Sequence, residues 1–313
     1  MKSIKKIKDL DPADFIIKWR LTNMCNADCS YCVRKPQHKT LDKDTIEKDE
    51  LNLCEIAKEV SRLIDNSNFN NVKIDLIGGE VTLFNLQTIL ENIKTDKLKV
   101  INITSNVLKD LSYFTDLCNY LHKRNIKLTL TASYHFEYIS FENYFEKVKA
   151  LNENVDFFCC EMVSLPDNQE LCKRFIDECK KNNLIYRCEV DIRFGKEDVR
   201  KLNLIADSNK QENARYEVTF TDGSKQIYTT RNQLLIDRTI KENVNQNVIQ
   251  TNGMMCTKNY DFIYIDFDIV GGRTNNTNSC LTKTRIQDFN LIAPKPCTAK
   301  GCTLCGHMDL WRV

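Results

Sequence analysis

The chain has 313 residues, of which 42% are hydrophobic and 28% charged, so it can bury a substantial core and is not a disordered segment. Its 45 lysines and arginines nearly balance its 43 acidic residues, and a net charge of +2 gives no global attraction to a polyanion. No apolar run reaches the roughly 18 residues that a transmembrane helix needs. The charged start, MKSIKKIKDL, lacks the apolar core of a secretory signal. We therefore expect a cytoplasmic protein that acts without a membrane.

Short β-rich apolar runs alternate with amphipathic segments over the first part of the chain. The runs cover 16–22, 72–77, 98–104, 126–133, 155–164 and 184–192, and the amphipathic segments cover 84–94, 110–124, 141–151 and 168–183. Strands that alternate with helices at this spacing are typical of βαβ units with a parallel sheet and right-handed crossovers. One continuous period favours an α/β fold with a partial (β/α)6 TIM-type barrel over an open sheet, although periodicity alone does not separate the two.

The alternation stops near residue 195. Residues 196–213 have a helical pattern, and 216–230 alternate around Asp222-Gly223, a dipeptide that is typical of a β-hairpin turn. A second β unit is expected at 261–272, before a cysteine-rich tail. We expect three parts: a partial barrel over 1–195, a bridging helix and hairpin over 196–250, and a small α+β cysteine-rich domain over 251–313.

Fifteen cysteines are many for a protein expected in the cytoplasm, where disulfides are rare, so metal binding or catalysis is the better explanation. Eight of them form two clusters. The other seven lie in apolar or helical stretches and are expected to be small buried hydrophobic side chains: Cys54, Cys118, Cys159, Cys160, Cys172, Cys179 and Cys188.

The first cluster, LTNMCNADCSYC, places Cys25, Cys29 and Cys32 in a C-x3-C-x2-C pattern directly after the first expected strand. Three close thiolates suit zinc or an iron–sulfur cluster. Structural zinc is the weaker alternative, because it needs a fourth protein ligand and none is adjacent in the sequence. Three cysteines on a [4Fe–4S] cube leave one iron free to bind a substrate or cofactor.

Further polar motifs follow the next three strands in order. Gly78-Gly79-Glu80 comes after the second strand, Ser105-Asn106 ends the third, and Ser133 and His135 end the fourth. Ligands collect at the carboxyl ends of parallel barrel strands, where all of these motifs fall. The glycines permit a close backbone approach to a ligand, and Glu80 can pair with an ammonium group. An ordinary turn at the glycines, a helix N-cap at Ser105-Asn106 and a packed His135 remain the simpler alternatives.

This ordered set resembles the radical S-adenosylmethionine superfamily, whose signature is C-x3-C-x2-C with an aromatic residue, here Tyr31, before the last cysteine. The resemblance covers about residues 15–195 and implies that the three cysteines hold a [4Fe–4S] cluster. Val81 stands where the family often has a proline. The residues that the resemblance assigns to S-adenosylmethionine are Tyr31, Gly78, Gly79, Glu80, Ser105, Asn106, Ser133 and His135.

The second cluster comprises five cysteines that flank the second β unit and end in a C-x2-C pair: Cys256, Cys280, Cys297, Cys302 and Cys305. With Gly271-Gly272, this arrangement resembles the auxiliary-cluster domain called Twitch, a short relative of SPASM. The interval from the glycines to Cys280 is longer than is usual there. The resemblance implies one auxiliary [4Fe–4S] cluster, with Cys297 as the ambiguous member beside four expected ligands: Cys256, Cys280, Cys302 and Cys305. Zinc is the alternative for this cluster.

The resemblance implies an oxidoreductase-like enzyme with two [4Fe–4S] clusters and S-adenosylmethionine, which generates a 5′-deoxyadenosyl radical that abstracts hydrogen. The expected reaction is an oxidative or cross-linking modification of a peptide or protein side chain. Alternatives are oxidation, dehydrogenation or rearrangement of a small molecule such as an amino sugar, and a non-enzymatic metal-binding or electron-transfer protein. Expected partners are the peptide or small-molecule substrate and a reductant such as flavodoxin or ferredoxin. The charge balance argues against a nucleic acid.

Overall fold

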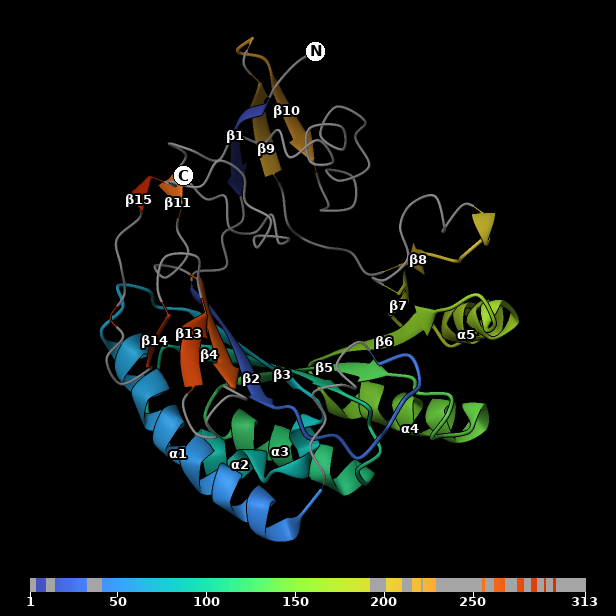
Figure 1. The fold of residues 1–313 in the computed structure, drawn as a ribbon, viewed down its shortest axis with the longest axis horizontal. Coiled ribbons are helices and arrows are strands. Elements are labelled where there is room, and N and C mark those ends of the chain that lie inside the picture. The colour runs from blue at the N-terminus through green and yellow to red at the C-terminus, as the bar shows by residue number, and fades with distance from the viewer. Residues whose placement is uncertain are drawn as a thin grey trace.

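The main element of the protein is one large sheet in the order β14-β13-β12-β2-β3-β4-β5-β6-β7-β8 (Figure 1). The strands from β12 to β7 run parallel. They are β12 (Phe262–Phe267), β2 (Phe15–Thr22), β3 (Val72–Gly78), β4 (Leu98–Ser105), β5 (Lys127–Ser133), β6 (Phe157–Ser164) and β7 (Tyr186–Val190). The structure is a computed structural model that describes residues 4–9, 15–32, 41–191, 201–209, 216–220, 222–228, 255–256, 262–267, 275–278, 283–285, 290 and 295–296.

Strands β2 to β7 follow one another in the sheet in the same order as in the sequence. This is the order of a (β/α) barrel and not of a doubly wound sheet, in which the strand order reverses at a switch point. The predicted α/β class and the six predicted strands are therefore confirmed. Antiparallel strands extend both edges, namely β13 (Asn275–Asn278) and β14 (Lys283–Arg285) beside β12, and β8 (Asp207–Ser208) beside β7.

Helices connect the consecutive strands, and α1 to α4 lie along one face of the sheet (Figure 1). Helix α5 packs against β6 and β7. The helices are α1 (Lys43–Asp65), α2 (Leu86–Leu90), α3 (Leu111–His122), α4 (Phe141–Asn154) and α5 (Gln169–Lys181). The last four confirm the predicted amphipathic segments, whereas α1 is absent from the prediction. Among the described residues, no helix is both long and apolar enough to cross a membrane.

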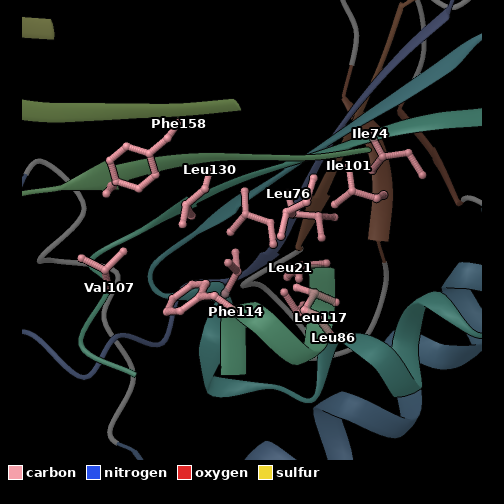
Figure 2. Close-up of a cluster of buried hydrophobic side chains, with 14 of the residues drawn as sticks. Leu21, Ile74, Leu76, Leu86, Ile101, Val107, Phe114, Leu117, Leu130 and Phe158 are labelled. Atoms are coloured by element: carbon pink, nitrogen blue, oxygen red, sulfur yellow. The ribbon is translucent and has the colours of Figure 1, made fainter. Parts of the chain in front are cut away.

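Alternate residues of the strands face the helices and form the core. In β2, Phe15, Ile17, Trp19 and Leu21 are fully buried, and the residues between them are more exposed on average. Figure 2 shows how side chains from neighbouring strands meet those of α3, among them Leu117. The period of two in the strands therefore decides which face carries the helices.

The predicted hairpin is confirmed, with β9 (Tyr216–Phe220) and β10 (Lys225–Tyr228) paired antiparallel. Gly223 has a φ of 82°, which glycine adopts without the steric cost of a side chain. The structure adds a strand that the sequence did not predict, because β1 (Ile4–Asp9) pairs with β9. This three-stranded sheet lies on the side of the main sheet that faces away from α1 to α4 (Figure 1).

The helix that we expected over 196–213 is wrong in its second half. Within the described residues 201–209, Asp207–Ser208 form β8 and pair with β7. The Asn209 side chain accepts a hydrogen bond from the backbone N–H of Tyr186 at 2.7 Å, and Asn209 N–H donates to the Tyr186 carbonyl at 3.3 Å. These backbone groups lie at the edge of the sheet, and pairing them outweighs a weak local helix propensity.

The described strands near the C-terminus belong to two sheets. The β unit expected at 261–272 is present as β12, which extends the main sheet beside β2. In contrast, β11 (Met255–Cys256) pairs with β15 (Lys295–Pro296) in a two-stranded sheet. The limits that we expected for the three parts of the chain, including the one at residue 251, stay a prediction.

The helix-facing core predicts a large difference between two leucines on helices. Leu117 is 1% exposed on α3, whereas Leu51 is 71% exposed on α1. Leu117→Ala should lower the free energy of unfolding by about 3–5 kcal/mol, because it removes buried contacts and leaves a cavity. The control Leu51→Ala should change it by less than about 0.5 kcal/mol. Urea-induced unfolding followed by circular dichroism measures both, and equal shifts would contradict this description of the core.

Candidate cluster and cofactor site

The three cysteines of the first cluster lie on the loop that follows β2. Cys29 is buried, and Cys25 and Cys32 are half-buried. The Cys32 N–H donates to the Cys29 carbonyl at 3.1 Å, and the Ala27 N–H approaches Cys25 Sγ at 3.4 Å. Burial raises the pKa of Cys25 to about 11 and that of Cys29 to about 12, so both thiols are protonated near neutral pH without a metal. A bound metal would displace these protons.

Gly78 and Gly79 support this loop from the end of β3. Gly79 N–H donates to the Thr22 carbonyl at 2.9 Å, and Glu80 N–H donates to the Met24 carbonyl at 2.8 Å. A Cβ at Gly79 would lie 2.1 Å from the Met24 carbonyl oxygen, and one at Gly78 would lie 2.6 Å from that of Thr22. The glycines are therefore required for a close approach to the chain's own backbone, directly before Cys25.

Glu80 joins the ends of β3 and β4. It is 1% exposed, and its Oε1 accepts hydrogen bonds from Thr82 N (2.9 Å), Thr82 Oγ1 (2.6 Å) and Ser105 Oγ (2.8 Å). Its Oε2 accepts one from Asn106 N at 2.7 Å. Burial raises the pKa of Glu80, and the four donors counteract that shift. Each carboxylate oxygen has about two acceptor sites, so Oε2, which accepts one hydrogen bond, keeps capacity for a further donor such as an ammonium group.

The end of β4 contacts the cysteine loop through Asn106. Its Nδ2 donates to Asn26 Oδ1 at 2.7 Å and lies 4.0 Å from Cys25 Sγ. The following residue, Val107, has a φ of 50°, which is strained for a β-branched side chain. The simpler explanation of Ser105-Asn106 as a helix N-cap is wrong, because the N-cap of α3 is Asp110.

His135 and Tyr31 meet beside Cys29. His135 Nδ1 lies 3.2 Å from Cys29 Sγ and 3.0 Å from Tyr31 Oη. Burial lowers the pKa of His135 to about 4, so the imidazole is neutral near neutral pH. The Tyr31 ring stacks on Phe136 with 5.1 Å between the centroids. His135 is therefore a packed side chain and also a contact of Cys29, so the two interpretations of this residue do not exclude each other.

The segment after β5 holds the loop at two more points, which the sequence analysis missed. Glu137 Oε2 accepts a hydrogen bond from Ser30 N at 2.8 Å, and Tyr138 Oη accepts one from Asp28 N at 2.5 Å. The available signal was their position shortly after His135, at the end of a barrel strand. Ser133 is half-buried at the carboxyl end of β5, on the same edge of the sheet.

Of the five cysteines in the second cluster, the structure describes one. For Cys256 the structure describes the backbone, which lies in β11. Four others lie outside the described residues: Cys280, Cys297, Cys302 and Cys305. The expectation of burial is confirmed for Cys118, Cys159, Cys160, Cys172, Cys179 and Cys188, whereas Cys54 is half-buried.

No protein-family model matches the sequence, and no curated protein matches it. Similar solved structures include anSMEcpe with bound AdoMet and Cp18Cys peptide (14% identity, TM-score 0.42), and Streptococcus suis SuiB bound to precursor peptide SuiA (16%, 0.44). Another is BtrN in complex with AdoMet and 2-DOIA (16%, 0.28). The matches cover 56%, 60% and 48% of this chain but only 51%, 44% and 58% of those proteins. Likeness at this level does not establish a family or an activity.

The backbone contact at Gly79 predicts that Gly79→Ala displaces the cysteine loop, because a Cβ would overlap the Met24 carbonyl at 2.1 Å. If the loop and the C-terminal cysteines each hold a [4Fe–4S] cluster, the iron content should fall from about eight to about four per chain. The control Gly223→Ala strains the turn of the hairpin, where an added Cβ meets no atom within 4 Å, and should keep the parent's iron content. Anaerobic reconstitution followed by iron analysis tests this, and full iron in Gly79→Ala would contradict the role of the glycine.

Proposed function

We propose that this protein is a radical S-adenosylmethionine enzyme. The observation that carries the proposal is a single hydrogen-bonded assembly at the carboxyl ends of neighbouring parallel strands. Glu80 at the end of β3 bonds Ser105 and Asn106 at the end of β4, and Asn106 in turn bonds Asn26 within the cysteine loop. His135 after β5 contacts Cys29. Thiols and polar groups from four strand ends thus surround one place, where a barrel binds its ligand.

The donor set fits the expected groups. Cys25, Cys29 and Cys32 would hold a [4Fe–4S] cluster with one iron left for S-adenosylmethionine. When bound, this pair supplies a 5′-deoxyadenosyl radical that abstracts hydrogen from the substrate. Glu80 Oε2 is available for the methionine ammonium, and Ser133 at the next strand end for a hydroxyl.

The protein residues around the cysteines position and shield them. Neutral His135 is placed to hydrogen-bond the Cys29 sulfur, which would orient that ligand and tune the cluster. Tyr31 and Phe136 stack beside it and exclude water from this side of the loop. A metal-binding or electron-transfer protein needs the thiols but has no use for the buried Glu80 network, so we favour the enzyme.

A second cluster in the C-terminal region is part of the proposal. Four of the five cysteines there would ligate it: Cys256, Cys280, Cys302 and Cys305, with Cys297 as the alternative. In the pairing of β11 with β15, Cys256 lies opposite Lys295. Cys297 is only two residues further along the sequence, which supports keeping it as a candidate ligand. A closed second cluster would accept an electron from the substrate and make the reaction oxidative.

We favour a peptide or protein side chain as the substrate. The three-stranded sheet β1-β9-β10 supports this choice, because strands can bind an extended peptide by β-addition. Its outer strand β10 carries Ile227, which is 59% exposed and available for an apolar peptide side chain. Oxidation of a small molecule such as an amino sugar is the alternative that the test below distinguishes.

The proposed chemistry predicts that the dithionite-reduced protein slowly cleaves S-adenosylmethionine to 5′-deoxyadenosine without substrate. The triple variant Cys25→Ala, Cys29→Ala, Cys32→Ala should retain about four irons per chain and lose this cleavage, because the cluster with the open iron is gone. The control Cys54→Ala removes a thiol on α1 and should cleave normally. Liquid chromatography of the products measures the reaction, and zinc-loaded protein without charge-transfer absorbance would refute the proposal.

The peptide assignment predicts that a short peptide encoded beside the gene stimulates 5′-deoxyadenosine formation and loses two hydrogen atoms by mass spectrometry. Ile227→Asp should weaken this stimulation at least about tenfold, since it places a charge against the apolar contact, and should leave the uncoupled cleavage unchanged. Leu51→Asp, the same change at an apolar side chain that is 71% exposed on α1, serves as the control. Stimulation by amino sugars and not by the peptide would favour the small-molecule alternative.

A further inference from the structure

A second group of metal-ligand side chains lies at the end of the barrel opposite the cysteine loop. Cys118 and His122 are four residues apart in the last turns of α3, so they share one face of the helix. Asp156 directly precedes β6. Helices of a βαβ unit end, and strands begin, at the amino edge of the sheet, so this group is separate from the site proposed above.

The three side chains converge on one point. His122 Nε2 lies 2.9 Å from Asp156 Oδ2 and 3.6 Å from Cys118 Sγ. All three ligand atoms lie within 4.8 Å of one another, and no other such trio occurs in the described ranges. The Leu128 N–H donates to Asp156 Oδ2 at 2.8 Å and fixes the carboxylate in place.

A single imidazole proton cannot bridge all three side chains. A neutral imidazole has at most one proton on Nε2, and that proton can serve the carboxylate at 2.9 Å. Cys118 Sγ then faces a nitrogen without a free lone pair, although it is 3.6 Å away. If Nε2 is unprotonated, its lone pair faces the carboxylate instead. A cation between the three atoms would satisfy a thiolate, an imidazole and a carboxylate together.

We propose that Cys118, His122 and Asp156 form a mononuclear zinc site. Zinc bonds of about 2.3 Å to sulfur and about 2.0 Å to nitrogen give a tetrahedral S···N distance of about 3.5 Å, close to the 3.6 Å observed. The distance from His122 Nε2 to Asp156 Oδ2 would open from the hydrogen-bonded 2.9 Å to about 3.3 Å when zinc binds. Water would complete the tetrahedron. The ion can enter from solvent, because the side chains of His122 and Asp156 are 51% and 25% exposed, while buried Cys118 forms the floor.

The site would join the end of α3 to the start of β6, so zinc should stabilise the fold. This proposal does not depend on radical chemistry. Cleavage of S-adenosylmethionine by the variants below should match that of the parent. A failure of the zinc proposal and a failure of the proposed function are therefore distinguishable.

The test uses the full chain after anaerobic iron–sulfur reconstitution, so that the other cysteine clusters are occupied. The protein is dialysed against zinc and then against a weak chelator, and its zinc is measured by mass spectrometry. The parent and the thiol control Cys54→Ala should retain one zinc per chain more than Cys118→Ala and His122→Gln. Equal zinc in all four proteins would overturn the proposal.

Cobalt binding and thermal unfolding provide two further measurements. Added Co²⁺ should give a thiolate charge-transfer band in the parent that Cys118→Ala lacks. Zinc should raise the melting temperature of the parent but not of Asp156→Asn, which keeps an oxygen able to accept the Leu128 hydrogen bond. His122→Gln changes a half-exposed side chain and should fold normally. A parent that is not stabilised by zinc, or that shows no cobalt–thiolate band, would contradict the site.

Discussion

The close contact between Gly79 and the backbone at Met24 is the constraint on which the rest of the site depends. With the Gly79 and Glu80 N–H groups bonded to the Thr22 and Met24 carbonyls at 2.9 and 2.8 Å, the pairing of β3 with β2 continues beyond the regular strands. The first residues of the cysteine loop therefore have the rigidity of a sheet. Cys25 follows immediately, so the position of the first thiol is set by backbone hydrogen bonds and not by flexible side chains.

The buried Glu80 side chain connects the end of β3 to the end of β4. Taking a carboxylate out of water costs free energy unless donors surround it, and Thr82, Ser105 and Asn106 supply them. Removing any donor would leave a buried charge less well compensated, so the ends of β3 and β4 are tightly coupled. Val107 has a strained backbone directly after this network, which is where functional sites often store such strain.

The two ends of the barrel differ in their chemistry. At the carboxyl edge, three thiols lie among apolar and aromatic neighbours such as Tyr31 and Leu165. At the amino edge, Cys118 is joined by an imidazole and a carboxylate that solvent can reach. The first environment suits a large, shielded cluster, and the second suits a single borderline-soft ion with a water ligand. The same parallel sheet supports both environments, because the loops that follow the carboxyl ends of its strands differ from those that precede the amino ends.

The sequence by itself determined the six strand segments of the parallel sheet, the four later helices, the hairpin and the motifs at the strand ends, whereas the structure decided the order of the strands in the sheet. These follow from hydrophobic period and turn chemistry, which act over a few residues. Only the tertiary structure decided that Gly79 contacts Met24, that Glu80 is enclosed by Ser105 and Asn106, and that β1 pairs with β9. The same holds for β8 in place of a helix end and for Asp156 beside His122. Each of these is a contact between segments distant in the chain, set by the packing of neighbouring strands and invisible to any local pattern.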